Sequence, residues 1–211
     1  MLNFNDLVEK DGLYYEINSD VPFTGDVTGS VVVNFKNGKP EGEHLGYYKS
    51  GQLKFKGIYK DGKEEGEFLY YYENGQLKEK GNVKDGKWEG EYLEYYDKGQ
   101  LKFKRNYKDG KEEGEFLSYY EKGQLKEIRN YKDGKLEGEF LYYYKNGQLW
   151  IKNNYKNVKL EGERSVYYEN GLLEKTEIYK DGKLIKNIKH WNLNPKISQS
   201  FIYLKVDKLV R

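Results

Sequence analysis

Aromatic and aliphatic residues alternate with charged residues through most of the chain, and short turn signals interrupt the alternation at regular distances. Residues 61–84, DGKEEGEFLYYYENGQLKEKGNVK, contain two such alternating segments between Asp61-Gly62, Asn74-Gly75 and the next turn signal. Alternation over about 5–8 residues is typical of β-strands. Both dipeptides favour two-residue type I′ turns, in which the two central residues have positive φ. One unit is therefore predicted to be one β-hairpin.

The unit recurs every 24 residues without insertion or deletion. Six full units run from Asn37 to Lys180, and the flanking residues 1–36 and 181–211 depart from the pattern. An exact period indicates that each unit packs in the same way on its neighbours. The sequence predicts an all-β protein, an elongated antiparallel meander of 24-residue hairpins in one twisted sheet. Residues 1–36 are expected to form an N-terminal cap or degenerate repeat, and residues 181–211 a basic C-terminal cap or tail. The segment 201–206 in that tail fits a strand or a short helix.

The turn positions predict a register. A two-residue turn at Asn74-Gly75 places Tyr72 opposite Leu77 and Phe68 opposite Gly81, and the turn at Asp61-Gly62 places Lys56 opposite Glu67. The equivalent predicted charge pairs are Lys80 with Glu91, Lys104 with Glu115, and Lys152 with Glu163.

The predicted register also sorts residues onto two faces. One face collects the residues equivalent to Phe68, Tyr72, Leu77 and Tyr59, together with the Glu-Gly glycines, where a neighbouring ring is expected to lie over the backbone. This face is the better candidate for the packed side. The other face carries rows of Leu and Tyr beside Lys and Glu.

Composition excludes several classes of function. Charged residues make up 34% of the chain, yet the net charge is only +2, which argues against a general polyanion binder. The absence of Cys excludes a disulfide scaffold and a thiolate metal site, and His44 and His190 have no neighbours at ligand spacing. The carboxylates repeat with the period, as a solvated ladder does, whereas a catalytic pair is expected to break the repeat. No enzymatic activity, catalytic residue, cofactor, metal site or small-molecule substrate is predicted.

The consensus K-D-G-K-x-E-G-E-F-x-x-Y-Y-x-N-G-Q-L-K-x-K-G-N-Y resembles the MORN-type repeat, and most closely its bacterial variant. The resemblance extends over residues 12–183, including GLYYEINSDVPFTGDVTG at residues 12–29, which is similar to the lead-in that such proteins carry. It implies an array of β-hairpins in a protein-binding role, since many of these proteins are described as antitoxin components. The chain departs from the pattern near the end of the array, at Val158, Arg164 and Leu172.

These observations favour a non-enzymatic repeat protein that binds a protein partner, a toxin or another effector, and neutralises it by covering a functional surface. The candidate partner-binding residues are the Tyr and Leu rows of the central units: Tyr71, Tyr95, Tyr119 and Tyr143 with Leu69, Leu93, Leu117 and Leu141. Partner choice is expected to depend on positions that vary between units: Phe55, Glu79, Phe103, Glu127, Ile151 and Lys175.

Two alternatives remain at this stage. A nucleic-acid-associated inhibitor or adaptor is disfavoured by the Glu in every unit. A membrane- or envelope-associated scaffold would use the tail 181–211, which has seven basic and two acidic residues. The first ten residues, MLNFNDLVEK, lack the apolar region of a secretory signal, so a cytoplasmic location is expected, with an exported protein whose signal was removed as the alternative.

Overall fold

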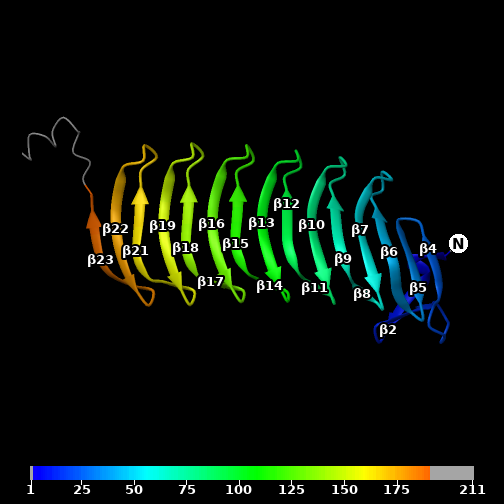
Figure 1. Cartoon of the computed structure of the whole chain (residues 1–211). Helices are drawn as coiled ribbons and strands as arrows, with labels where there is room; N and C mark the ends of the chain where they lie inside the picture. The colour runs from blue at the N-terminus through cyan, green and yellow to red at the C-terminus, as the bar shows by residue number, and fades with distance from the viewer. Residues whose placement is uncertain (1, 191–211) are drawn as a thin grey trace, which may run out of the picture.

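The computed structural model describes residues 2–190, so the expected strand or helix at residues 201–206 lies outside the described part of the chain. Within these residues, twenty-one strands form one sheet, and two more pair with each other beside it. Figure 1 shows the repeats side by side in an elongated array. The prediction of an all-β meander of 24-residue hairpins is confirmed. No helix within residues 2–190 is long and apolar enough to cross a membrane.

The elements before the repeats are β1 (Leu2–Asn3), η1 (Phe4–Asp6), β2 (Leu7–Lys10), β3 (Leu13–Glu16), β4 (Gly25–Thr28) and β5 (Val31–Lys36). The strands of the repeats and the strand after them are β6 (Lys39–Tyr47), β7 (Leu53–Lys60), β8 (Lys63–Glu64), β9 (Gly66–Tyr71), β10 (Leu77–Lys84), β11 (Lys87–Trp88), β12 (Gly90–Tyr95), β13 (Leu101–Lys108), β14 (Lys111–Glu112), β15 (Gly114–Tyr119), β16 (Leu125–Lys132), β17 (Lys135–Leu136), β18 (Gly138–Tyr143), β19 (Leu149–Lys156), β20 (Lys159–Leu160), β21 (Gly162–Tyr167), β22 (Leu173–Lys180) and β23 (Lys183–Lys189).

The Asp-Gly turns have the predicted geometry. Asp61 and Gly62 have φ of 51° and 81°, and Lys60 pairs with Lys63 across the turn. Both central residues are left-handed, as a type I′ turn requires. The same turn at Asn157 and Val158 keeps positive φ of 51° and 66°, although Val158 is β-branched. The repeat geometry therefore holds even where the favourable glycine is missing.

The prediction of a type I′ turn at Asn74-Gly75 is wrong. Gly75 has φ of 84°, but Asn74 is not left-handed. The Gly75 N–H donates to the Tyr72 carbonyl at 2.9 Å, and the Tyr72 N–H donates to the Gln76 carbonyl at 2.8 Å. This longer loop with a left-handed glycine is typical of a type I turn followed by a bulge. Leu77 consequently pairs with Tyr71 rather than with Tyr72, and it lies on the face of Tyr71.

The Glu-Gly dipeptides form a bulge that shifts the register within each repeat. Gly66 has φ of 80°, and the Glu65 N–H donates to the Ile58 carbonyl at 2.9 Å. Lys56 therefore pairs with Leu69, so the predicted opposition of Lys56 and Glu67 is wrong. The same shift overturns the other predicted cross-repeat pairs, Lys80 with Glu91, Lys104 with Glu115 and Lys152 with Glu163. The pairing of Phe68 with Gly81 is confirmed.

The prediction that aromatic rings lie over the Glu-Gly glycines is wrong, and the rings cover glycines inside the long strands instead. A Cβ added at Gly66 would meet no atom within 4 Å, and the other Glu-Gly glycines are similarly open, with one atom at 3.9 Å as the nearest. A Cβ at Gly46, Gly57 or Gly81 would instead lie within 3.0 Å of a ring. The Glu-Gly glycines thus supply the left-handed bulge, and the strand glycines make room for aromatic rings.

Two sets of hydrogen bonds join neighbouring repeats. The Tyr48 hydroxyl donates to the Tyr71 carbonyl of the next repeat at 2.7 Å, and equivalent bonds come from Tyr72, Tyr96, Tyr120 and Tyr144. The carboxylate of Glu41 accepts from the Asp61 N–H in the next turn at 2.8 Å, and the same bond recurs along the array. These bonds explain why Tyr and Glu keep the 24-residue period.

The N-terminal segment packs on one end of the array. Val27, Val33 and Phe35 are almost completely buried, and Leu2, Phe4 and Leu7 pack against them. The hairpin of β2 and β3 stands beside the main sheet (Figure 1), and β5 pairs with β6 across the expected boundary at residue 36. At the other end β23 pairs with β22, so the start of the expected tail continues the sheet.

Candidate interaction surface

The two faces of the repeat sheet differ in character. We call the face that carries Phe68, Tyr70, Gly81 and Val83, with their equivalents in other repeats, the aromatic face. We call the opposite face, which carries Glu67, Leu69, Tyr71 and Lys80 with their equivalents, the Leu/Tyr face. Phe68, Val83, Tyr92 and Phe116 are buried, which makes the aromatic face the packed one, as expected.

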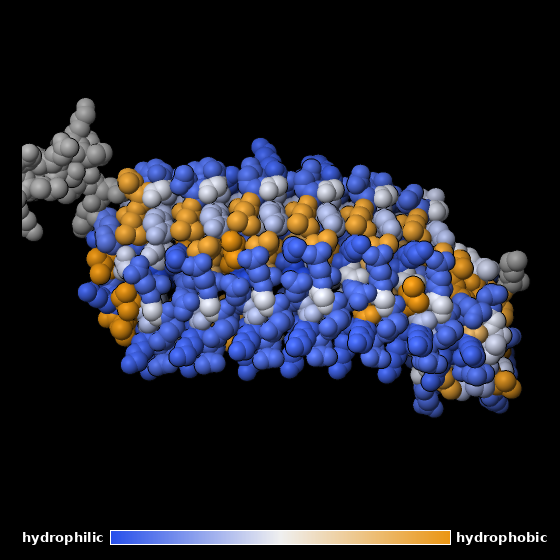
Figure 2. Space-filling view, in the orientation of Figure 1, coloured by the Kyte–Doolittle hydropathy of each residue, from blue (hydrophilic) through white to orange (hydrophobic). Residues whose placement is uncertain are grey.

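The predicted partner-binding residues all lie on the Leu/Tyr face. Leu69 pairs with Lys80, and Tyr71 pairs with Leu77; the same arrangement recurs at Leu93, Tyr95, Leu117, Tyr119, Leu141 and Tyr143. These Leu and Tyr side chains are half-buried along the array. Figure 2 shows a band near the Asn-Gly loops in which hydrophobic and moderately polar residues alternate along the array, as expected of Leu and Tyr rows that recur in every repeat.

Ion pairs lie beside these rows. Lys80 binds Glu67 at 2.7 Å, and the equivalent pairs are Lys56 with Glu43, Lys104 with Glu91 and Lys152 with Glu139. Each joins residues diagonally across one hairpin, because the bulge moves the Glu of the next repeat away. The partners are about half exposed, so solvent screens each pair and it contributes little to stability. Their regular spacing makes them a charged border of the Leu/Tyr rows.

The residues that vary between repeats follow one another on the aromatic face, as expected. Phe55 pairs with Tyr70, Tyr70 with Glu79, and Glu79 with Glu94 of the next repeat. The series continues through Phe103, Ser118, Glu127, Tyr142, Ile151, Val166 and Lys175. A strip of unequal side chains therefore runs along the centre of a face that is otherwise regular.

The sequence analysis did not predict two charged clusters that include residues of this strip and their neighbours on the aromatic face. Arg129 binds the nearly buried carboxylate of Glu127 and lies over the ring of Phe116, with 4.8 Å between the guanidinium and the ring centroid. At the end of the array Arg164 and Lys175 both bind Glu177. The sequence does show a change from glycine to charged and polar residues at one position of the repeat. The residues at this position in successive repeats are Gly57, Gly81, Arg105, Arg129, Asn153 and Glu177.

Local contacts shift the pKa values of these groups. Burial acts to raise the pKa of Glu79, but hydrogen bonds from Lys78 and Tyr92 outweigh it and hold the pKa below its ordinary value. The hydrogen bond from Arg129 to Glu127 raises the pKa of the guanidinium, against the effect of burial. Both groups are therefore charged at neutral pH and serve as ion-pair partners.

Four buried polar atoms in residues 2–190 have no hydrogen-bond partner, and all lie on the aromatic face: His44 Nδ1, Arg105 Nε, Ser118 Oγ and Asn153 Oδ1. His44, Ser118 and Asn153 occur where their repeat departs from the others, whereas Arg105 is shared with Arg129 of the next repeat. Within the same residues no group of three or more His, Cys, Asp or Glu is placed to hold a metal ion.

An extended sheet of stacked hairpins, with two broad faces and repeat-to-repeat hydrogen bonds, defines an all-β tandem-repeat protein of the binding-module type. The sequence profile of the MORN repeat variant matches six consecutive segments, residues 40–61, 64–85, 88–109, 112–133, 136–157 and 160–181. These segments cover more than half of the chain, and the chain belongs to the MORN repeat variant family. Repeats of this family generally mediate interactions with proteins or membranes. No curated protein matches the chain.

Proposed function

We propose that this chain binds a protein partner, a toxin or another effector, through the Leu/Tyr face and neutralises it by covering its functional surface. The observation that carries the proposal is the half-buried state of the Tyr and Leu rows in successive repeats. Their remaining surface is removed from water only when a partner covers it. Burial of apolar area contributes about 25 cal/mol per Å², and Tyr residues are frequent hot spots of protein interfaces.

The spacing of the rows limits what fits them. Consecutive rows are separated by two strands, which is about 10 Å. The hydrogen bonds between repeats hold the rows in place before binding, so little conformational entropy is lost on association. A folded partner with apolar contacts at about this spacing fits the face, with the Lys and Glu border setting its position.

The test compares three forms of the full chain in an affinity capture from a lysate of the source organism, with and without nuclease. The surface variant combines Tyr71→Ala, Tyr95→Ala, Tyr119→Ala and Tyr143→Ala. The matched control combines Asn82→Ala, Asn106→Ala, Asn130→Ala and Asn154→Ala, which lie on the same face closer to the Asp-Gly turns. The melting temperature verifies that each form is folded.

One stoichiometric protein retained by the wild type and the control, but lost by the Tyr variant, is the expected result, and nuclease has no effect on it. Equal capture by the Tyr variant would place the partner elsewhere. Loss on nuclease treatment would favour a nucleic-acid adaptor, and recovery only with membranes would favour a scaffold. If co-expression fails to suppress the activity of the captured protein, the neutralising role is wrong.

A further inference from the structure

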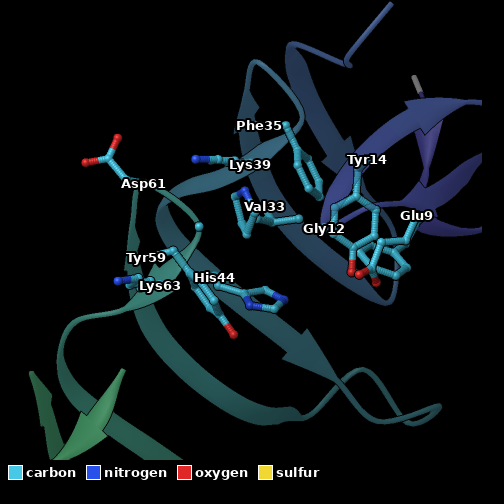
Figure 3. Close-up of a pocket in the computed structure, with 13 residues that line it drawn as sticks. Glu9, Gly12, Tyr14, Val33, Phe35, Lys39, His44, Tyr59, Asp61 and Lys63 are labelled. Carbon is cyan, nitrogen blue, oxygen red and sulfur yellow. The ribbon is translucent and has the colours of Figure 1, made fainter. Parts of the chain in front are cut away.

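A cavity of about 450 Å³ lies between the N-terminal hairpin and the aromatic face of the first repeat. Gly12 and Tyr14 line it on the side of the hairpin, and His44 and Tyr59 line it on the side of the repeat (Figure 3). Phe4 of η1 also contributes to the lining. Val33 and Phe35 provide buried apolar walls. The volume is within the range of about 300–1,000 Å³ that is usual for small-ligand sites.

The cavity separates two clusters of rings. On one side Tyr14 lies 5.0 Å from Phe35 and 5.6 Å from Phe4, measured between ring centroids. On the other side His44 lies 4.8 Å from Phe55 and 5.1 Å from Tyr59. Further along the aromatic face, ring contacts join some neighbouring repeats, as in Phe55 and Tyr70 at 5.9 Å and Phe103 and Phe116 at 5.6 Å. Within residues 2–190 no ring contact joins the two clusters, and the cavity lies between them.

His44 gives this place a polar group. The equivalent residues of the next four repeats are Phe68, Tyr92, Phe116 and Phe140. The Nδ1 atom of His44 is buried without a hydrogen-bond partner, and burial lowers the pKa of the imidazole. A neutral imidazole has one nitrogen that donates and one that accepts. Because His44 lines the cavity, a ligand with a hydrogen-bonding group can pair with the imidazole there.

The charges around the cavity do not select for a charged ligand. Lys39 and Lys63 are matched by Glu9 and Asp61 in the lining. Figure 3 shows the imidazole of His44 projecting toward the side of Tyr14 and Glu9, whereas the amino groups of Lys39 and Lys63 lie on the other side. Rings on two sides and one hydrogen-bonding nitrogen in the wall fit an uncharged aromatic group.

We propose that this cavity is a binding site for an uncharged aromatic ring that carries a hydrogen-bonding group, such as a phenol or an indole, with His44 as its polar partner. The ring fills the gap between the two clusters, and its polar group pairs with the imidazole. A free aromatic compound and a Tyr or Trp side chain of a protein share this chemistry. The site is separate from the Leu/Tyr face, so it does not depend on the function proposed above.

The experiment titrates the full chain with p-cresol, indole, toluene and the tripeptide acetyl-Gly-Tyr-Gly-amide, and follows backbone amide signals by NMR. The test variant is His44→Phe, which installs the residue found in other repeats and is expected to fold. His44→Gln retains a hydrogen-bonding group and provides a second variant. His190→Phe is the matched control, because it removes the other His of the chain.

The expected result is saturable binding of p-cresol and indole, with shifts confined to residues around the cavity. The wild type should bind toluene at least about fivefold more weakly than p-cresol, as expected for one lost hydrogen bond. The His44→Phe variant should bind p-cresol at least about fivefold more weakly than the wild type does, for the same reason. The controls His190→Phe and His44→Gln should bind p-cresol within about threefold of the wild type, a range that one weakened hydrogen bond covers.

Equal binding of the tripeptide and p-cresol would identify the ligand as a side chain of a protein, and binding of p-cresol alone would identify a free compound. Both results support the site. Absence of saturable shifts, shifts spread along the whole aromatic face, or undiminished p-cresol binding by His44→Phe would overturn the proposal.

Discussion

At the residue scale, glycines have two separate functions in this chain. Those of the Glu-Gly dipeptides, such as Gly66, adopt positive φ at a bulge and have open space around them. Those inside the long strands, such as Gly57 and Gly81, are covered by aromatic rings. The first kind is needed for its backbone conformation, and the second kind for its missing side chain.

Gly57→Ala is expected to destabilise the chain by about 1–3 kcal/mol, because the new methyl group overlaps the ring of Phe68. Urea denaturation measures the free energy of unfolding. Adding Phe68→Leu should recover part of the loss, since it removes the overlapping ring edge. The neighbouring Ile58→Ala, on an exposed side chain, serves as the control and should change stability by less than about 0.5 kcal/mol. An equal loss in both single variants would show that the ring contact is not the cause.

His44 is expected to make stability depend on pH. Burial lowers the pKa of His44 in the folded chain, so the unfolded chain binds the proton more readily. The free energy of unfolding should therefore fall as the pH drops below the ordinary His pKa of about 6.5. His44→Phe should reduce this dependence between pH 7.5 and pH 5, measured by urea denaturation at each pH. His190→Phe provides the comparison, and a pH dependence that His44→Phe leaves intact would contradict this account.

At the element scale, each hairpin combines one tight turn, one longer loop and one bulge. The Asp-Gly turn is a type I′ turn, the Asn-Gly loop ends in a left-handed glycine, and the Glu-Gly bulge shifts the register. The sixth repeat opens with a departure from this scheme, because Val158 replaces the glycine of the turn. A β-branched residue at positive φ is strained, at a cost of roughly 1–2 kcal/mol for a left-handed L-residue.

Val158→Gly is accordingly expected to stabilise the chain by about 1 kcal/mol, since the greater flexibility of Gly in the unfolded chain offsets part of the relieved strain. The reverse change, Gly134→Val, occupies the same position one repeat earlier and should destabilise by about 1–2 kcal/mol. Chemical denaturation of both variants provides a matched pair. Changes of the same sign would refute the strain argument.

At the scale of the whole molecule, the repeats are coupled through a ladder of Tyr hydroxyls. In each Tyr-Tyr dipeptide from Tyr71-Tyr72 onward to Tyr143-Tyr144, the second Tyr donates to the backbone of the next repeat. The first Tyr makes no side-chain hydrogen bond within the described residues. Its ring lies on the Leu/Tyr face, where the partner is proposed to bind. In each pair, the second Tyr therefore couples the repeats, and the first Tyr forms part of the candidate interaction surface.

Replacing Tyr72, Tyr96, Tyr120 and Tyr144 by Phe should lower stability by about 1 kcal/mol for each lost hydrogen bond. It should also weaken the coupling between repeats, so that denaturation becomes broader and ceases to be two-state. The control replaces Tyr71, Tyr95, Tyr119 and Tyr143 by Phe and should change stability by less than about 0.5 kcal/mol per site. Circular dichroism during denaturation separates the two sets, and identical curves would show that the ladder does not couple the repeats.

The sequence by itself determined the features that depend on neighbouring residues and on the period. These are the all-β hairpin array, the type I′ geometry at Asp61-Gly62, and the opposite faces of Phe68 and Leu69. Turn dipeptides and strict alternation act locally, so they can be recognised without knowing what a segment packs against.

Only the tertiary structure decided the register around the bulges and loops and the ion pair of Lys80 with Glu67. The same is true of the charged clusters on the aromatic face and of the cavity at His44. A bulge moves every pairing beyond it, and Asn-Gly suits more than one kind of loop. The cavity depends on how the N-terminal hairpin stands over the first repeat. These features arise from contacts between distant segments, which local patterns do not specify.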